Sequence, residues 1–78
     1  MNAKERQVEI NRLRDLIEGA KDDLAFVADE AEEALDNTPE NLQGSENFQR
    51  SEEKKDLLNE AVSDLEELVD KLDEHQNV

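Results

Sequence analysis

Two stretches of the chain place apolar residues at alternating steps of three and four positions. In the first stretch these positions are Ile10, Leu13, Ile17, Ala20, Leu24, Val27, Ala31 and Ala34. In the second they are Phe48, Ser51, Lys55, Leu58, Val62, Leu65, Val69 and Leu72, of which only Ser51 and Lys55 are polar. This spacing aligns side chains on one face of a helix and is typical of a coiled-coil seam. It predicts two helices of about thirty residues each.

The segment between the two repeats carries the only proline and one of the two glycines. Thr38 precedes Pro39, which suits the N-cap and first residue of a short helical turn, and Gly44 suits its end. Ser45 then has the position of the N-cap of the second helix. We therefore predict an all-α chain that forms one unit over residues 1–78, a coiled-coil-like antiparallel two-helix hairpin. Its expected parts are a helix over about 4–36, a turn over 37–45 and a helix over about 46–75.

The register of the hairpin follows from the residue numbers, because facing residues of antiparallel helices have a constant sum. A sum of 82 pairs the two repeats: Ile10 with Leu72, Leu13 with Val69, Ile17 with Leu65, Ala20 with Val62, Leu24 with Leu58 and Ala34 with Phe48. The same register sets Arg12 level with Asp70 and Arg50 level with Glu32. We expect these two ion pairs to join the helices, each contributing less than about 1 kcal/mol.

A second apolar surface is expected beside the seam. A lone two-helix hairpin buries little apolar area, and domains this small generally need a staple, a metal or oligomerisation. Five apolar residues outside the two repeats fall on one flank of the hairpin: Leu16, Phe26, Leu57, Ala61 and Leu68. We expect them to form the interface of a homodimer with the architecture of a four-helix bundle.

The charge of the chain is strongly acidic, with a formal net charge of −14. From Asp22 to Gln49 there is no Lys or Arg, whereas nine carboxylates occur: Asp22, Asp23, Asp29, Glu30, Glu32, Glu33, Asp36, Glu40 and Glu46. Such a field disfavours nucleic acid and anionic lipid as direct partners and favours basic protein surfaces. We call these nine residues the acidic stretch.

The acidic stretch has two interpretations. A run of charge on a helix is often a solvated face that keeps a small protein soluble. However, Asp29 to Asp36 lie near the C-terminal end of the first helix, where the helix dipole favours cations. A ladder of carboxylates on one helix could instead replace a phosphate backbone in a groove lined by Lys and Arg.

The residues that usually carry chemistry are scarce. The spacing Glu32-Glu33-x-x-Asp36 with Glu67-x-x-Asp70 is similar to that of helical magnesium-dependent nucleotide pyrophosphatases, but the register places the two groups far apart. There is no cysteine, and His75 is the only histidine. We expect no enzymatic activity, no metal and no cofactor. Because the first residues lack a signal-like apolar run, we expect a cytoplasmic protein.

The segment Asn37-Thr38-Pro39-Glu40-Asn41-Leu42-Gln43-Gly44-Ser45-Glu46, set between an acidic helix and a Glu/Leu-rich helix, resembles the centre of small acidic helical proteins encoded by phages and prophages. The resemblance covers about the middle third of the chain. It implies a phage setting, in the cytoplasm of the host, and it transfers no catalytic residues. Small phage proteins of this charge are often inhibitors of host nucleic-acid machinery, including defence nucleases.

Two functions follow as expectations. The first is an acidic binding module that masks the nucleic-acid-binding surface of a basic protein, such as a nucleic-acid enzyme or a defence nuclease. The second is a structural or adaptor protein that binds a partner helix through its apolar flank. The first predicts salt-sensitive association that needs the acids, and the second predicts association that needs the apolar flank and depends little on salt.

Overall fold

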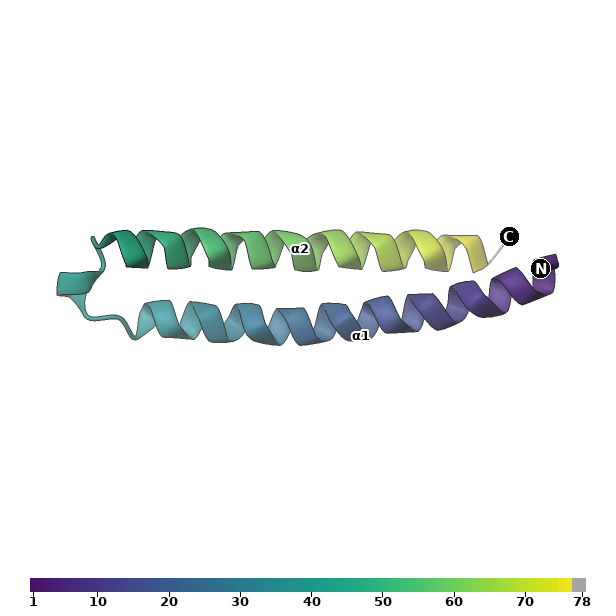
Figure 1. The fold of residues 1–78 in the computed structure, drawn as a ribbon, viewed down its shortest axis with the longest axis horizontal. Helices are drawn as coiled ribbons and strands as arrows, with labels where there is room; N and C mark the ends of the chain where they lie inside the picture. Colours follow the sequence, from purple (N-terminus) through teal and green to yellow (C-terminus); the bar gives the residue numbers. More distant parts are fainter. Residues whose placement is uncertain (77–78) are drawn as a thin grey trace.

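The computed structural model describes the main chain of residues 1–76 and the side chains of residues 1–74. Helix α1 spans Ala3–Asp36, a short 3-10 helix η1 spans Glu40–Leu42, and helix α2 spans Glu46–Gln76. The two long helices lie side by side and the turn joins them at one end, opposite the end that holds the N-terminus (Figure 1). The hairpin measures 60 × 18 × 14 Å along its principal axes. The predicted all-α hairpin is confirmed.

Both long helices begin at a polar cap. The Asn2 side chain accepts a hydrogen bond from the Glu5 main-chain N–H at 2.8 Å. The Ser45 hydroxyl accepts one from the Phe48 N–H at 3.1 Å, which confirms Ser45 as the cap of α2. Each bond satisfies one of the N–H groups that the first turn of a helix leaves without a partner.

The predicted role of Thr38 is wrong. Its hydroxyl donates a hydrogen bond to the Ala34 carbonyl at 2.9 Å, so it closes the end of α1. The short helix η1 starts after Pro39 without a side-chain cap. The last turn of a helix leaves carbonyls without main-chain partners, and Thr38 lies within reach of one of them.

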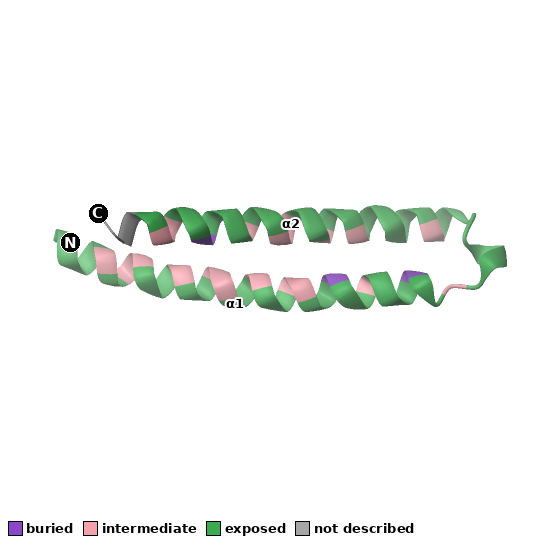
Figure 2. Ribbon diagram, turned by 180° about the vertical axis from the view of Figure 1, so that it is seen from behind, coloured by how far each residue is buried: buried purple, intermediate pink, exposed green. Residues whose placement is uncertain are grey.

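The face of α1 that packs against α2 is rotated from the predicted seam. One predicted row is half-buried as expected: Ile10, Ile17, Leu24 and Ala31. The other predicted row is exposed: Leu13, Ala20, Val27 and Ala34. Its place against α2 is taken by Arg14, Lys21, Ala28 and Leu35. On α2 the predicted seam is observed except at Ser51, which is exposed, and the less exposed residues of both helices face each other (Figure 2).

The rotation has a geometric cause. The apolar surface of α1 is three rows wide once the stems of Arg14 and Lys21 are counted, and one neighbouring helix covers about two rows. Both side chains are only 21% exposed, and each ends in an ion pair with a carboxylate, Arg14 with Asp73 and Lys21 with Asp22. Lys55 does the same from α2, with its side chain 23% exposed. The row that contains Leu13 and Val27 is therefore left uncovered.

The core of the hairpin is thin. Among the described side chains only Ala28, Leu35 and Val69 are buried, with 2%, 9% and 5% of their surface exposed. A two-helix layer has no interior beyond the line of contact between the helices, so most apolar residues keep one side in solvent. The fold therefore leaves much apolar surface for a partner.

A bidentate ion pair joins the two helices. Arg14 donates to both carboxylate oxygens of Asp73, at 2.8 Å from Nε and 3.0 Å from Nη2, and also binds Glu18 on its own helix. The expected pairs of Arg12 with Asp70 and of Arg50 with Glu32 are wrong. Arg12 binds Glu9 and Arg50 binds Glu46, because side chains three or four residues apart on one helix are nearer.

The Arg14–Asp73 pair gives a pH-dependent prediction. The hydrogen bond from Arg14 holds the pKa of the Asp73 carboxyl below its ordinary value of 3.8. A depressed pKa means that the pair stabilises the fold above pH 3.8 and that this contribution is lost as the pH falls through the folded value. We expect Asp73→Asn to lower the melting temperature slightly at pH 7, and we expect the difference from wild type to vanish near pH 2.

The matched control is Asp70→Asn, which removes one exposed charge from the same helix face. Because net negative charge disfavours the compact state, this control should raise the melting temperature or leave it unchanged. Equal melting temperatures of wild type and Asp73→Asn at pH 7 would show that the ion pair adds nothing.

Candidate protein-binding surfaces

The nine residues of the acidic stretch are all exposed. Seven of them lie on α1, Glu40 opens η1, and Glu46 opens α2. Asp22, Asp29 and Asp36 follow at intervals of seven residues, so they form a straight row along α1 with about 10 Å between neighbours. This row lies about 140° around the helix from the row that contains Val27.

Most of the stretch has no cation beside it. Within the described part of the chain, ion pairs involve only two of its members: Asp22 with Lys21 at 3.4 Å and Glu46 with Arg50 at 2.8 Å. No ion pair of the described residues includes Asp29, Glu30, Glu32, Glu33, Asp36 or Asp23. The last turn of α1 holds no basic residue. This end of the hairpin therefore presents carboxylates whose charge no neighbouring side chain neutralises.

The basic residues explain this imbalance. Three of the nine cations, Arg14, Lys21 and Lys55, are held largely within the contact between the helices. Lys54 lines a pocket beside the turn. Arg12 is engaged by Glu9 on its own helix. The outer side of α1 is consequently more acidic than its composition alone indicates.

The acidic surface extends further than the sequence indicated. Residues seven apart on α2 form two more rows that contain carboxylates. Both rows lie on the side of the hairpin that carries Asp73 and the Asp22 row. Their members are Glu52 and Glu66, together with Asp56 and Asp70, all of them exposed. The heptad spacing that predicted the seam could have identified these rows. The predicted acidic surface was confined to the segment without Lys or Arg, most of whose carboxylates lie on α1.

The opposite side of the hairpin is an apolar face. On α1 it contains the uncovered row Leu13, Ala20, Val27 and Ala34, bordered by Leu16. On α2 it contains Leu57, Ala61 and Leu68. Of the five residues predicted to form a dimer interface, Leu16, Phe26, Leu57 and Leu68 are 58%, 64%, 64% and 41% exposed, and Ala61 is half-buried. Phe26 lies apart from the others, about 100° around α1 from Val27 and about 40° from Asp22. We use the name apolar face for the eight residues without Phe26.

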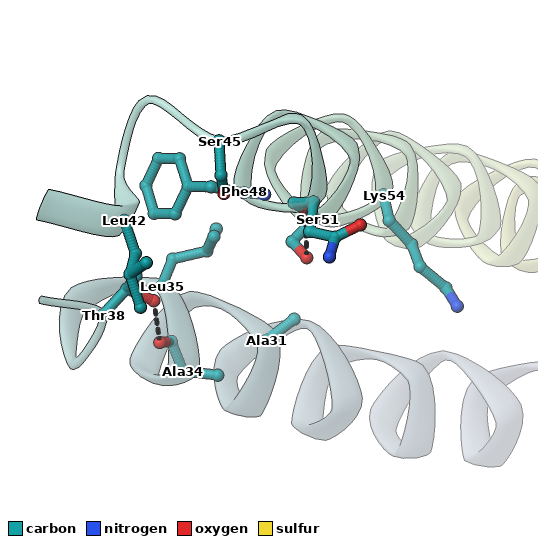
Figure 3. Close-up of a pocket in the computed structure, with 10 residues that line it drawn as sticks. Ala31, Ala34, Leu35, Thr38, Leu42, Ser45, Phe48, Ser51 and Lys54 are labelled. Carbon is teal, nitrogen blue, oxygen red and sulfur yellow. Dashed lines mark hydrogen bonds between the residues drawn. The ribbon is translucent and has the colours of Figure 1, made fainter.

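A pocket of about 480 Å³ shows that the Leu13 row of α1 and the Leu68 row of α2 lie on the same side of the hairpin. It lies at the turn and is lined by Ala31, Ala34, Leu35, Thr38, Leu42, Ser45, Asn47, Phe48, Ser51 and Lys54 (Figure 3). Ala34 belongs to the Leu13 row of α1, whereas Asn47 and Lys54 belong to the row of α2 that continues to Ala61 and Leu68. These two rows therefore lie on the same side of the hairpin, and the pocket lies between their ends at the turn.

The pocket offers apolar contact beside the turn. Leu35, Leu42 and Phe48 gather at the end of the pocket beside the turn, and Lys54 stands at the other end (Figure 3). In residues 1–74, no group of three or more His, Cys, Asp or Glu side chains converges so as to hold a metal ion. His75 has its side chain outside the described residues. In the described helices, no segment is long and apolar enough to cross a membrane.

No protein-family model matches the chain, and no match was found among curated proteins or solved structures.

Proposed function

We propose that the protein is a binding module whose acidic stretch covers the basic nucleic-acid-binding surface of another protein. The observation that carries this proposal is the row of exposed carboxylates on α1. Within the described residues, Asp22 is the only member of this row that pairs with a cation. The module acts by occlusion, without catalysis, metal or cofactor. It does not bind nucleic acid or membranes itself, because its net charge of −14 repels both.

The charge density of α1 fits this function. Seven carboxylates occur from Asp22 to Asp36, a distance of about 21 Å at the helical rise of 1.5 Å per residue. This is one negative charge per about 3 Å, close to the value of about 3.4 Å for one strand of DNA. A groove that holds a phosphate backbone with Lys and Arg would attract this helix with similar strength.

The biological setting is part of the proposal. The resemblance of residues 37–46 to small phage and prophage proteins supports a phage protein that acts in the host cytoplasm. Its target would then be a nucleic-acid-binding enzyme or a defence nuclease of the host. The target class follows from the charge of the surface that fits the acidic stretch, and the resemblance supplies the setting.

Four carboxylates on the side away from the apolar face provide the test. The variant Asp22→Asn, Asp29→Asn, Glu32→Gln and Asp36→Asn should lose most of its binding to basic proteins captured from host lysate at low salt. We expect affinity for the captured target to fall about tenfold or more and its dependence on salt to weaken. Nucleic acid added to the wild-type complex should compete for the target.

The matched control changes the same number of charges on α2. Glu53, Glu60, Glu67 and Glu74 form one exposed row there, and replacing all four by Gln gives the same net charge as the first variant. If both variants lose binding equally, net charge rather than the α1 surface is responsible. A partner that remains bound at high salt would exclude the masking function.

The apolar face supports a second candidate, a structural or adaptor protein that binds a partner helix. The observation in its favour is the exposure of Leu16, Leu57 and Leu68 on one flank. Such binding would resist salt and would be lost when these residues, rather than the acids, are changed.

The homodimer is the remaining part of the proposal. Two hairpins that bury their apolar faces against each other would form a four-helix bundle, and the predicted interface residues Leu16, Leu57, Ala61 and Leu68 would lie within or beside the contact. This dimer leaves the row Asp22, Asp29 and Asp36 free on the outside, so dimerisation and masking are compatible.

A further inference from the structure

The exposed area of the hairpin matches the requirement for a second copy. The chain exposes 6128 Å², whereas a compact monomer of 8.9 kDa exposes about 4,800 Å². The excess of about 1,300 Å² exceeds the roughly 800 Å² that each partner buries in an interface of standard size. With only three buried side chains in its described part, the hairpin also lacks the core that an independent fold of this size requires.

The borders of the apolar face carry opposite charges on the two helices. On α1 the rows beside the face are mainly acidic and contain Glu9, Asp23, Glu30 and Glu33. On α2 the corresponding rows are mainly basic and contain Arg50, Lys54 and Lys71. Electrostatic complementarity of this kind determines which surfaces meet and in which orientation.

Two stackings of the apolar faces are compatible with twofold symmetry. If the axis runs along the helices, α1 of one chain lies on α2 of its partner and both turns are at the same end. If the axis runs across the helices within the interface, α1 lies on α1, α2 lies on α2, and the turns are at opposite ends. The second stacking brings acidic border against acidic border and basic border against basic border.

The heights of the residues agree with the first stacking. Helix α1 ends at Asp36 and α2 begins at Glu46, on the two sides of the turn, so residues whose numbers sum to about 82 lie at about the same height. An axis along the helices preserves these heights between chains. It therefore brings the following residues of one chain level with residues of the other: Val27 with Leu57, Leu16 with Leu68, Glu33 with Arg50, and Glu30 with Lys54.

We propose that two copies of this chain form a four-helix bundle in which α1 packs on α2 of the partner with both turns at the same end. This arrangement rests on the homodimer proposed above. Apolar pairs and oppositely charged pairs then occur at matching heights along the same contact. The rows of Asp22, Asp29 and Asp36 from the two chains lie on opposite outer corners of the bundle, which gives the dimer two equivalent acidic surfaces.

Single cysteines test the arrangement, because the natural chain has none. Val27→Cys and Leu57→Cys chains are each prepared alone and as a mixture that is unfolded and refolded together. Both positions are exposed in the hairpin, so neither change disturbs its internal contacts. On mild oxidation we expect a covalent dimer in the mixture, and only a small fraction of that yield in either chain alone.

A third variant reports the opposite stacking. Ala20 lies near the middle of α1, is exposed and belongs to the apolar face. With the turns at opposite ends, Ala20→Cys would meet its own copy and crosslink, which would overturn the proposed arrangement. A dimeric mass without a crosslink between positions 27 and 57 would also overturn it. A monomeric mass by light scattering would instead exclude the homodimer itself. None of these three results bears on binding by the acidic stretch.

Discussion

Replacing Val69 by aspartate is expected to unfold the protein at 25 °C. Val69 is 5% exposed and is one of three buried side chains in the described part of the hairpin. The change removes a buried apolar group and places a carboxylate in the contact with α1, where Arg14, which lies level with it, is already engaged by Asp73 and Glu18. We expect a loss of about 4 kcal/mol or more, which is comparable with the total stability of a small domain. Circular dichroism at 222 nm should show the loss of helix.

Val8→Asp is the matched control for this prediction. Val8 also lies on a long helix, but it is 62% exposed, so the same change of residue and charge leaves the interhelical contact intact. We expect its helical signal to match that of wild type within error. A folded Val69→Asp variant with an unchanged melting temperature would contradict the packing of α2 against α1 described above.

Replacing Leu13 and Val27 together by aspartate is expected to dissociate the proposed dimer. Both residues belong to the row of α1 that α2 leaves uncovered, with 42% and 47% of their surface exposed. In the four-helix bundle they would be buried, so two charges would enter the interface without partners. We expect the mass from light scattering to fall by half at concentrations where the wild type is dimeric. Helix content should fall as well, because the isolated hairpin has so small a core.

The control for this pair introduces the same charge elsewhere. Gln49 and Ser63 are exposed on the side of α2 away from the apolar face, and replacing both by aspartate adds the same two negative charges. This control should remain dimeric. For the wild type, a melting temperature that rises with protein concentration would be the independent sign of a dimer. An unchanged mass of the Leu13→Asp, Val27→Asp variant would exclude an interface on the apolar face.

Much of the fold could be predicted from spacing and capping residues. The two repeats determine that helices form, because alternating steps of three and four keep apolar side chains on one face. Ser45 could be assigned as a cap because a hydroxyl before a helix finds N–H groups without partners. These are local properties, and they depend on residues within one or two turns of each other.

The arginine partners and the role of Thr38 could not be predicted in the same way. Arg12 and Arg50 each have an acid in reach on their own helix as well as one across the hairpin, and the register alone does not rank the two. Thr38 lies between the end of one helix and the start of another, and its hydroxyl can serve either. Here the helix that ends provides the nearer carbonyl.

The sequence located the acidic stretch. It did not show why so few cations lie beside these carboxylates. Nothing in the order of residues shows that Arg14, Lys21 and Lys55 hold their stems between the helices, because this depends on how far each helix is rotated. The same rotation leaves the Leu13 row uncovered and widens the apolar face beyond the five residues first assigned to it.

The sequence by itself determined two helices, one turn, a register near 82 and a strongly acidic surface, because each follows from periodicity, local capping or the count of charges. Only the tertiary structure decided which two of the three apolar rows of α1 meet α2. The physical reason is that the apolar surface of α1 is wider than one neighbouring helix can cover. The choice among rows then depends on packing across the hairpin, where Leu35 and Ala28 are buried and Arg14 reaches Asp73.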